Sequence, residues 1–246
     1  MAVTPGAAPA PEGGPETGPR AVRPARPGRD VPFRIDPRRT AGYRLARRIV
    51  WVVVRVWFRP KVAGRPGVPT EGPLILAPVH RSFADFVFTV FLTDRKLFFM
   101  AKDSLWRWRP LGRLLSVLGA FPVHRESADR EALHRAEEVL RQGQVLVLFP
   151  EGTRREGSAV HELQEGTSFL AARTGSRVVP VGIGRSDLAM PKGRTIPKPL
   201  TISVVAGPVI APPERAERAR VSRRQVHQAT TTLREALQQA YDQARG

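Results

Sequence analysis

From Leu74 onward the chain alternates between short apolar runs and segments with helical periodicity, and this alternation restricts the fold more than any other feature. The apolar runs lie at Leu74–Val79, Lys96–Lys102, Val145–Phe149, Arg177–Ile183 and Leu200–Ala206. Strands with nearly continuous apolar content belong in sheets that are buried on both faces. The sequence therefore predicts an α/β fold, with a mixed, largely parallel sheet covered by helices on both faces.

The segments between these runs are predicted to be helical. They are Ser82–Leu92, Leu111–Ala120, Glu126–Gly143 and Arg223–Ala244. In the third of them the apolar residues recur with the helical period, and Gly143 provides a favourable helix end.

The N-terminal part of the chain has a different composition. Residues 1–42 hold nine prolines, six glycines and seven arginines, with few large apolar side chains. Such a segment buries too little surface to offset the entropy lost on ordering, so we expect a disordered basic tail. We expect residues 43–65 to form an amphipathic membrane-interface helix and a linker, and residues 66–246 to form the folded domain.

The net charge of +18 predicts an anionic partner, which could be nucleic acid, a phosphate-bearing small molecule or an anionic membrane. Residues 1–65 carry fourteen Lys and Arg against four Asp and Glu, so more than half of the net charge lies in the first quarter of the chain. A basic nucleic-acid-binding protein is the alternative from another functional class. The sequence has no helix-turn-helix, zinc-finger or aromatic RNA-binding signature, so we expect no nucleic-acid partner.

Cysteine is absent, which excludes disulfides, thiolate nucleophiles and cysteine-ligated metals. The five histidines show no spacing typical of a metal site. Residues 1–30 lack the apolar centre of a signal peptide, so we do not expect export.

The segment Tyr43–Arg59 combines five arginines with Trp51, Trp57 and a valine run. Basic residues beside a short tryptophan-bearing helix suit the membrane headgroup region, although an ordinary packing helix would look similar. Its apolar run, Ile49–Phe58, has ten residues, whereas crossing a bilayer takes roughly 20. The sequence predicts a peripheral or monotopic helix at an anionic membrane surface.

Polar groups follow the predicted strands at three places. These are "HRSFAD" after the first core strand, "FPVHR" before a helix and "FPEGTR" after Val145–Phe149. Ligands of open α/β sheets gather where strands end and loops begin. The three segments are therefore candidates for a shared site.

His80 and Asp85 are too far apart in angle to meet on one continuous helix. If His80 lies in a loop and Ser82 begins the helix, Asp85 can reach back and hold one ring nitrogen as N–H, leaving the other as a free base. Such a dyad removes a proton from a hydroxyl that attacks an activated acyl group. The alternative is a capping box formed by Ser82 and Asp85, which explains those two residues but not His80.

Two arginines are candidates for an anion clamp. Arg154 follows the tight turn at Gly152, and Arg125 precedes a helix N-terminus, where backbone N–H groups favour an anion. The alternative is that each arginine is a solvated surface residue.

Together these residues resemble the glycerolipid acyltransferase family, which includes lysophosphatidic acid and glycerol-3-phosphate acyltransferases. The resemblance covers roughly Gly72 to Gly184. "HRSFAD" is similar to the family's His-x4-Asp block, "GAFPVHR" to its second block and "VVPVGI" to its fourth, while Phe149–Arg154 is identical to its third.

The resemblance implies acyl transfer from acyl-CoA or acyl-carrier protein to 1-acyl-glycerol-3-phosphate, forming phosphatidic acid at the cytoplasmic face of the cell membrane. It implies no metal and no bound cofactor, and makes residues 66–246 an acyltransferase domain. By carry-over His80 is the general base and Asp85 its orienting partner. The residues implied for the acceptor phosphate are Arg125, Glu151, Gly152, Thr153 and Arg154.

The chain departs from the family pattern at a few positions. Val79 stands where asparagine is frequent and His124 where aspartate is frequent. Downstream of the third block the family usually has a lysine before a glycine, whereas this chain has Gln164 and Glu165. These differences bear on the acceptor, so glycerol-3-phosphate, another lyso-lipid or a non-phosphate acceptor remain alternatives.

Overall fold

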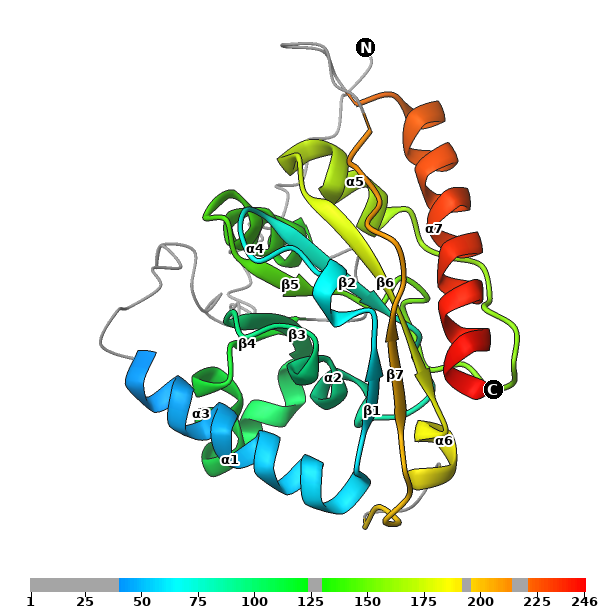
Figure 1. The fold of residues 1–246 in the computed structure, drawn as a ribbon. Coiled ribbons are helices and arrows are strands. Elements are labelled where there is room, and N and C mark those ends of the chain that lie inside the picture. Colours follow the sequence, from blue (N-terminus) through cyan, green and yellow to red (C-terminus); the bar gives the residue numbers. More distant parts are fainter. Residues whose placement is uncertain (1–39, 124–129, 192–195, 214–220) are drawn as a thin grey trace, which may run out of the picture. The chain divides into compact units, whose positions relative to one another are not determined.

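The computed structural model describes residues 40–123, 130–191, 196–213 and 221–246 (Figure 1). The predicted disordered tail, residues 1–42, lies outside this part except for its last three residues, which begin helix α1 (Thr40–Phe58). The division of the chain into residues 1–42, 43–65 and 66–246 stays a prediction.

Seven strands form one sheet within the described residues. They are β1 (Lys61–Ala63), β2 (Leu74–Pro78), β3 (Leu97–Lys102), β4 (Ala120–Val123), β5 (Val145–Val147), β6 (Arg177–Gly184) and β7 (Ser203–Ala206). Their order is β1-β7-β6-β2-β5-β3-β4, and every neighbouring pair is parallel except β6 and β7. The predicted mixed, largely parallel sheet is confirmed.

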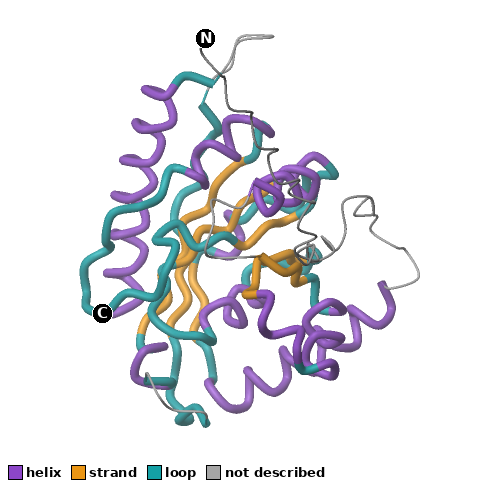
Figure 2. The backbone as a smooth tube through the Cα atoms, turned by 180° about the vertical axis from the view of Figure 1, so that it is seen from behind, coloured by secondary structure: helices purple, strands orange, loops and turns teal. Residues whose placement is uncertain are grey.

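Helices cover both faces of this sheet (Figures 1 and 2). One group packs together over β2, β5, β6 and β7: α4 (Arg130–Arg141), α5 (Gly166–Thr174) and α7 (Arg223–Arg245). The other group lies at the β3 and β4 side and comprises α1, α2 (Asp85–Phe88) and α3 (Arg109–Val117). The short α6 (Ser186–Ala189) follows β6.

One predicted helix differs from its observed form. The segment predicted as a helix over Ser82–Leu92 becomes α-helical only at Asp85 and continues as a 3-10 turn over Thr89–Phe91. The side chain of Asp85 accepts hydrogen bonds from the backbone of residues 81 and 82, and these bonds hold the preceding residues in a turn.

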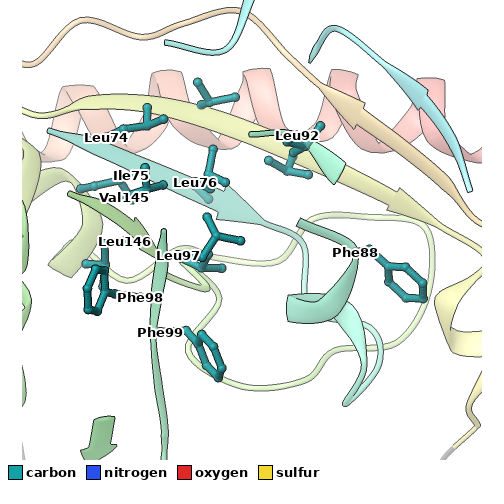
Figure 3. Close-up of a cluster of buried hydrophobic side chains, with 14 of the residues drawn as sticks. Leu74, Ile75, Leu76, Phe88, Leu92, Leu97, Phe98, Phe99, Val145 and Leu146 are labelled. Atoms are coloured by element: carbon teal, nitrogen blue, oxygen red, sulfur yellow. The ribbon is translucent and has the colours of Figure 1, made fainter. Parts of the chain in front are cut away.

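The core lies on both sides of β2. Leu74, Ile75 and Leu76 are fully buried, beside Val145 and Leu146 of β5 (Figure 3). At about 1.5–3 kcal/mol for each fully buried large apolar side chain, this cluster is a principal source of stability.

The register of the central strands fixes where the chain leaves the sheet. Leu76 of β2 is opposite Val147 of β5, and Val147 is opposite Phe99 of β3. Because the three strands are parallel, the residues that follow them emerge at one edge. The polar segments after β2 and β5 are therefore brought together, as the sequence predicts.

Candidate active site

His80 and Asp85 meet directly after strand β2. Asp85 Oδ2 lies 3.3 Å from Nδ1 of His80, and both side chains are buried. An ionised carboxylate only accepts hydrogen bonds, so Nδ1 is the protonated nitrogen of a neutral His80 ring. Among the described residues none bonds to Nε2, which is left as the basic nitrogen.

Asp85 also organises the backbone around this pair. Its Oδ2 accepts N–H hydrogen bonds from Arg81 and Ser82, both at 2.6 Å. Ser82 Oγ accepts from Ala84 N–H at 3.4 Å rather than from Asp85 N–H, so only half of a capping box forms. Asp85 therefore combines a local backbone role with its contact to the imidazole.

The segment after β5 encloses His80 from behind. The His80 N–H donates to Glu151 Oε2 at 3.0 Å, and the Arg155 N–H donates to the His80 carbonyl at 2.8 Å. The imidazole stacks on the Phe149 ring with 4.1 Å between centroids. The first and third motifs of the sequence thus form one unit around this histidine.

The Glu151 carboxylate is turned into the protein. Its side chain is fully buried, Oε1 accepts from the His161 N–H, and Oε2 accepts from Arg81 as well as from His80. It does not line the pocket into which His80 opens. Arg81, which sequence reasoning did not single out, is its ion-pair partner at 2.7 Å.

His80 opens into a pocket of about 210 Å³. Its polar lining consists of His80, Lys102, Ser104 and Arg154, and its remaining walls are mainly aromatic and aliphatic. A second cavity of about 220 Å³ adjoins it and has an almost entirely apolar lining. The two share five lining residues: Phe83, Phe86, Phe99, Leu105 and Leu115.

Helix α1 forms one wall of the apolar cavity through Tyr43, Arg47 and Val50. The Tyr43 hydroxyl accepts the Leu97 N–H at 3.0 Å, which fixes the helix to the start of β3. Burial raises the pKa of Tyr43, so its phenol stays protonated over the neutral range.

The residues predicted to bind phosphate lie in different places. Arg154 lines the pocket together with His80, whereas Thr153 is exposed and does not line it. Gly152 has a φ of 69°, and its close neighbour is the Gln164 side chain, so a Cβ at this position would overlap it. Arg125 lies outside the described residues.

Lys102 is a pocket-lining cation that sequence reasoning missed. It is the last residue of β3, and Phe99 in the same strand pairs with β5, so it lies at the sheet edge that carries His80. A lysine that ends an apolar strand was the available signal in the sequence.

The chain is similar in sequence to acyltransferases from plants and bacteria. The 1-acyl-sn-glycerol-3-phosphate acyltransferase LPAT1 of Arabidopsis thaliana chloroplasts is 26% identical over 58% of this chain and 42% of the relative. A 1-acyl-sn-glycerol-3-phosphate acyltransferase of Streptococcus pneumoniae is 33% identical over 45% of this chain and 41% of the relative. The matched stretch thus spans less than half of either relative.

The fold is shared with a solved structure. The acyltransferase PlsC of Thermotoga maritima superposes with a TM-score of 0.68 at 20% identity, over 86% of this chain and 83% of that chain. The family model described as Acyltransferase matches residues 59–184, which is half of the chain. The chain therefore belongs to the Acyltransferase family.

Proposed function

We propose that this protein transfers a fatty acyl group from acyl-CoA or acyl-carrier protein to the free hydroxyl of 1-acyl-glycerol-3-phosphate, forming phosphatidic acid. The observation that carries the proposal is a single pocket in which the buried His80–Asp85 pair meets the cations Lys102 and Arg154. The adjoining apolar cavity suits a hydrocarbon chain. The bacterial and chloroplast relatives are 1-acyl-sn-glycerol-3-phosphate acyltransferases, which supports this choice of acceptor.

The His80 ring acts as general base in the proposed reaction. Nε2 takes the proton of the acceptor hydroxyl while its oxygen attacks the thioester carbonyl carbon. The C–S bond then breaks, and the imidazolium returns the proton to the departing thiolate. Asp85, held by two backbone N–H groups, orients the ring and stabilises the imidazolium, so no covalent acyl-enzyme is needed.

Arg154 and Lys102 supply positive charge for the acceptor phosphate. A guanidinium matches phosphate oxygens with two parallel hydrogen bonds, and an ammonium acts as a point charge. Both line the pocket that contains His80, so one acceptor can place its phosphate near them and its hydroxyl near the base.

The acceptor is identified by a product assay. Purified protein is incubated with labelled acyl-CoA or acyl-carrier protein and with lysophosphatidate, glycerol-3-phosphate or a lyso-lipid without phosphate. We expect label in phosphatidic acid. Label only in the phosphate-free product would contradict the assignment and would favour a function like that of the lyso-ornithine lipid acyltransferase of Rhizobium meliloti, a relative with 29% identity.

Replacing Arg154 with alanine is expected to reduce kcat/KM for lysophosphatidate. The reduction should correspond to a loss of about 2–4 kcal/mol of transition-state stabilisation, which is the usual effect of removing one preorganised electrostatic group. Steady-state kinetics measure this loss. Arg155→Ala is the matched control, because its side chain is exposed and does not line the pocket, and alanine keeps the backbone N–H bonded to His80. Equal effects of both substitutions would contradict the role given to Arg154.

We further propose that α1 lies on an anionic membrane at its cytoplasmic face. None of the helices in the described residues is both long and apolar enough to span a bilayer. One side of α1 is buried through Tyr43, Val54 and Phe58. Its other side exposes large apolar groups beside arginines: Leu45, Ile49, Val52, Val53, Val56 and Trp57. This surface matches an interfacial helix.

The double substitution Ile49→Glu and Val53→Glu is expected to weaken binding to phosphatidylglycerol vesicles by about tenfold or more, because it removes apolar contacts and adds like charge. Vesicle sedimentation at moderate salt measures the effect. Leu133→Glu on α4 is the control, since this side chain is exposed in the other helix group. Undiminished binding would move the lipid contact elsewhere, for example to the exposed Trp108.

A further inference from the structure

Arg81 and Glu151 form a buried ion pair directly behind His80. Arg81 Nη1 donates to Glu151 Oε2 at 2.7 Å and approaches the His80 carbonyl at 3.3 Å. Its Nη2 donates to the Ala159 carbonyl at 2.9 Å, and its Cζ lies 4.9 Å from the Tyr241 ring centroid. Each end of the guanidinium is thus held by a different segment of the chain.

The role of this ion pair is better explained by the hydrogen bonds it makes to the His80 backbone than by a contribution to the free energy of unfolding. Burying two charges costs desolvation free energy that largely offsets their attraction, so a buried ion pair adds little net stability. The pair does supply fixed hydrogen-bonding partners for one backbone unit. Glu151 accepts the His80 N–H, while Arg81 and the Arg155 N–H both reach the His80 carbonyl.

Fixing the backbone of His80 determines where its imidazole can point. With the N–H and the carbonyl both bonded, the side chain retains only its own torsions. Those are limited by Phe149, which stacks on one face of the ring, and by Asp85 at Nδ1. A displacement of about 1 Å in a reacting group can reduce the rate by roughly 10²-fold.

We infer that Arg81 and Glu151 act as one positioning unit for His80, and that Glu151 does not contact the acceptor. Among the described residues, the hydrogen-bond partners of the Glu151 carboxylate are His80, Arg81 and His161, and the carboxylate does not line the pocket. Tyr241 of α7, which lies beyond the family match at residues 59–184, braces the guanidinium. The inference rests on the proposed role of His80 as general base.

Kinetics on four variants test this inference: Arg81→Gln, Glu151→Gln, the double variant and Arg81→Lys. Each single glutamine variant is expected to lower kcat by about 10- to 100-fold, with acceptor KM changed by less than about threefold. The double variant should be no worse than the poorer single variant, because two residues of one unit act non-additively. Arg81→Lys, which keeps a charge beside Glu151, should recover about tenfold of the kcat lost in Arg81→Gln.

Arg135→Gln is the matched control. It breaks an ion pair of similar length with Glu131 on the exposed side of α4 and should leave both constants unchanged. An acceptor KM that rises tenfold or more in Glu151→Gln with kcat unchanged would overturn the inference, because Glu151 would then touch the acceptor. Unchanged kcat in a folded Arg81→Gln variant would also overturn it. If Arg81→Gln does not fold, the inference is tested with Arg81→Lys and the double variant, because neither leaves a buried charge unpaired.

A second readout does not depend on activity. The chain has five histidines, so the His80 imidazole resonance can be assigned by NMR from its loss in His80→Ala. We expect it to shift or broaden in Glu151→Gln and to stay unchanged in Arg135→Gln. An unchanged His80 resonance in Glu151→Gln would overturn the inference, whether or not the wild type is active. If the wild type acylated none of the acceptors tested, that would refute the proposed function but not this inference.

Discussion

Replacing His80 with alanine is expected to lower kcat by about 10³-fold or more, because the variant has no base at the position the acceptor hydroxyl must reach. The fold should survive, since the backbone bonds of this residue to Glu151 and Arg155 do not involve its ring. Circular dichroism and steady-state kinetics on the same preparation measure both properties. A folded variant with wild-type activity would end the general-base assignment.

Asp85→Asn is the companion substitution, because Asp85 serves both the ring and the backbone. The asparagine carbonyl oxygen can still accept the N–H groups of Arg81 and Ser82, so the melting temperature should fall little. It carries no negative charge to stabilise the imidazolium that forms when Nε2 takes the proton, so kcat should fall by roughly 10²- to 10⁴-fold. Lost stability with retained activity would instead show that Asp85 acts only as a cap.

Replacing Gly182 with alanine should produce a large loss of stability. A Cβ on this residue of β6 would overlap the backbone carbonyl of Ala240 in α7. Because the obstacle is backbone rather than a flexible side chain, α7 would have to move away from the sheet. We expect a loss of about 3 kcal/mol, the upper part of the usual range for overpacking, and a fall of about 6–12 °C in Tm.

Thermal unfolding followed by circular dichroism measures this change. Gly166→Ala is the control, because its added methyl group would meet open space at the start of α5. We expect its Tm to stay within about 2 °C of the wild type. An unchanged Tm in Gly182→Ala would contradict the close packing of α7 on β6.

The central strands of this fold were predictable because their sequences are almost wholly apolar. Strand β4 was not, since Pro122 is unfavourable in a strand interior and its segment follows a helical pattern. Its position at the edge of the sheet explains how the proline is accommodated. Strand β1 has only three residues, one of them a charged lysine, and carries no recognisable pattern.

The sequence likewise predicted part of the candidate site but not all of its contacts. The proximity of His80 and Arg154 follows from parallel strands that end at one edge, and the sequence contains that pattern. The contact of Arg81 with Glu151 joins residues seventy positions apart, and it depends on side-chain directions within the loops that follow β2 and β5. Sequence spacing carries no information about such directions, so the burial of the Glu151 carboxylate away from the pocket could not be predicted.

The most direct test of the proposed mechanism is a crystal structure of the protein with lysophosphatidate and a non-transferable acyl-CoA analogue. We expect the acceptor hydroxyl oxygen within about 2.6–3.2 Å of His80 Nε2. We also expect the phosphate to lie against Arg154 and Lys102. An acceptor whose phosphate lies away from both cations, with its hydroxyl out of reach of His80, would contradict it.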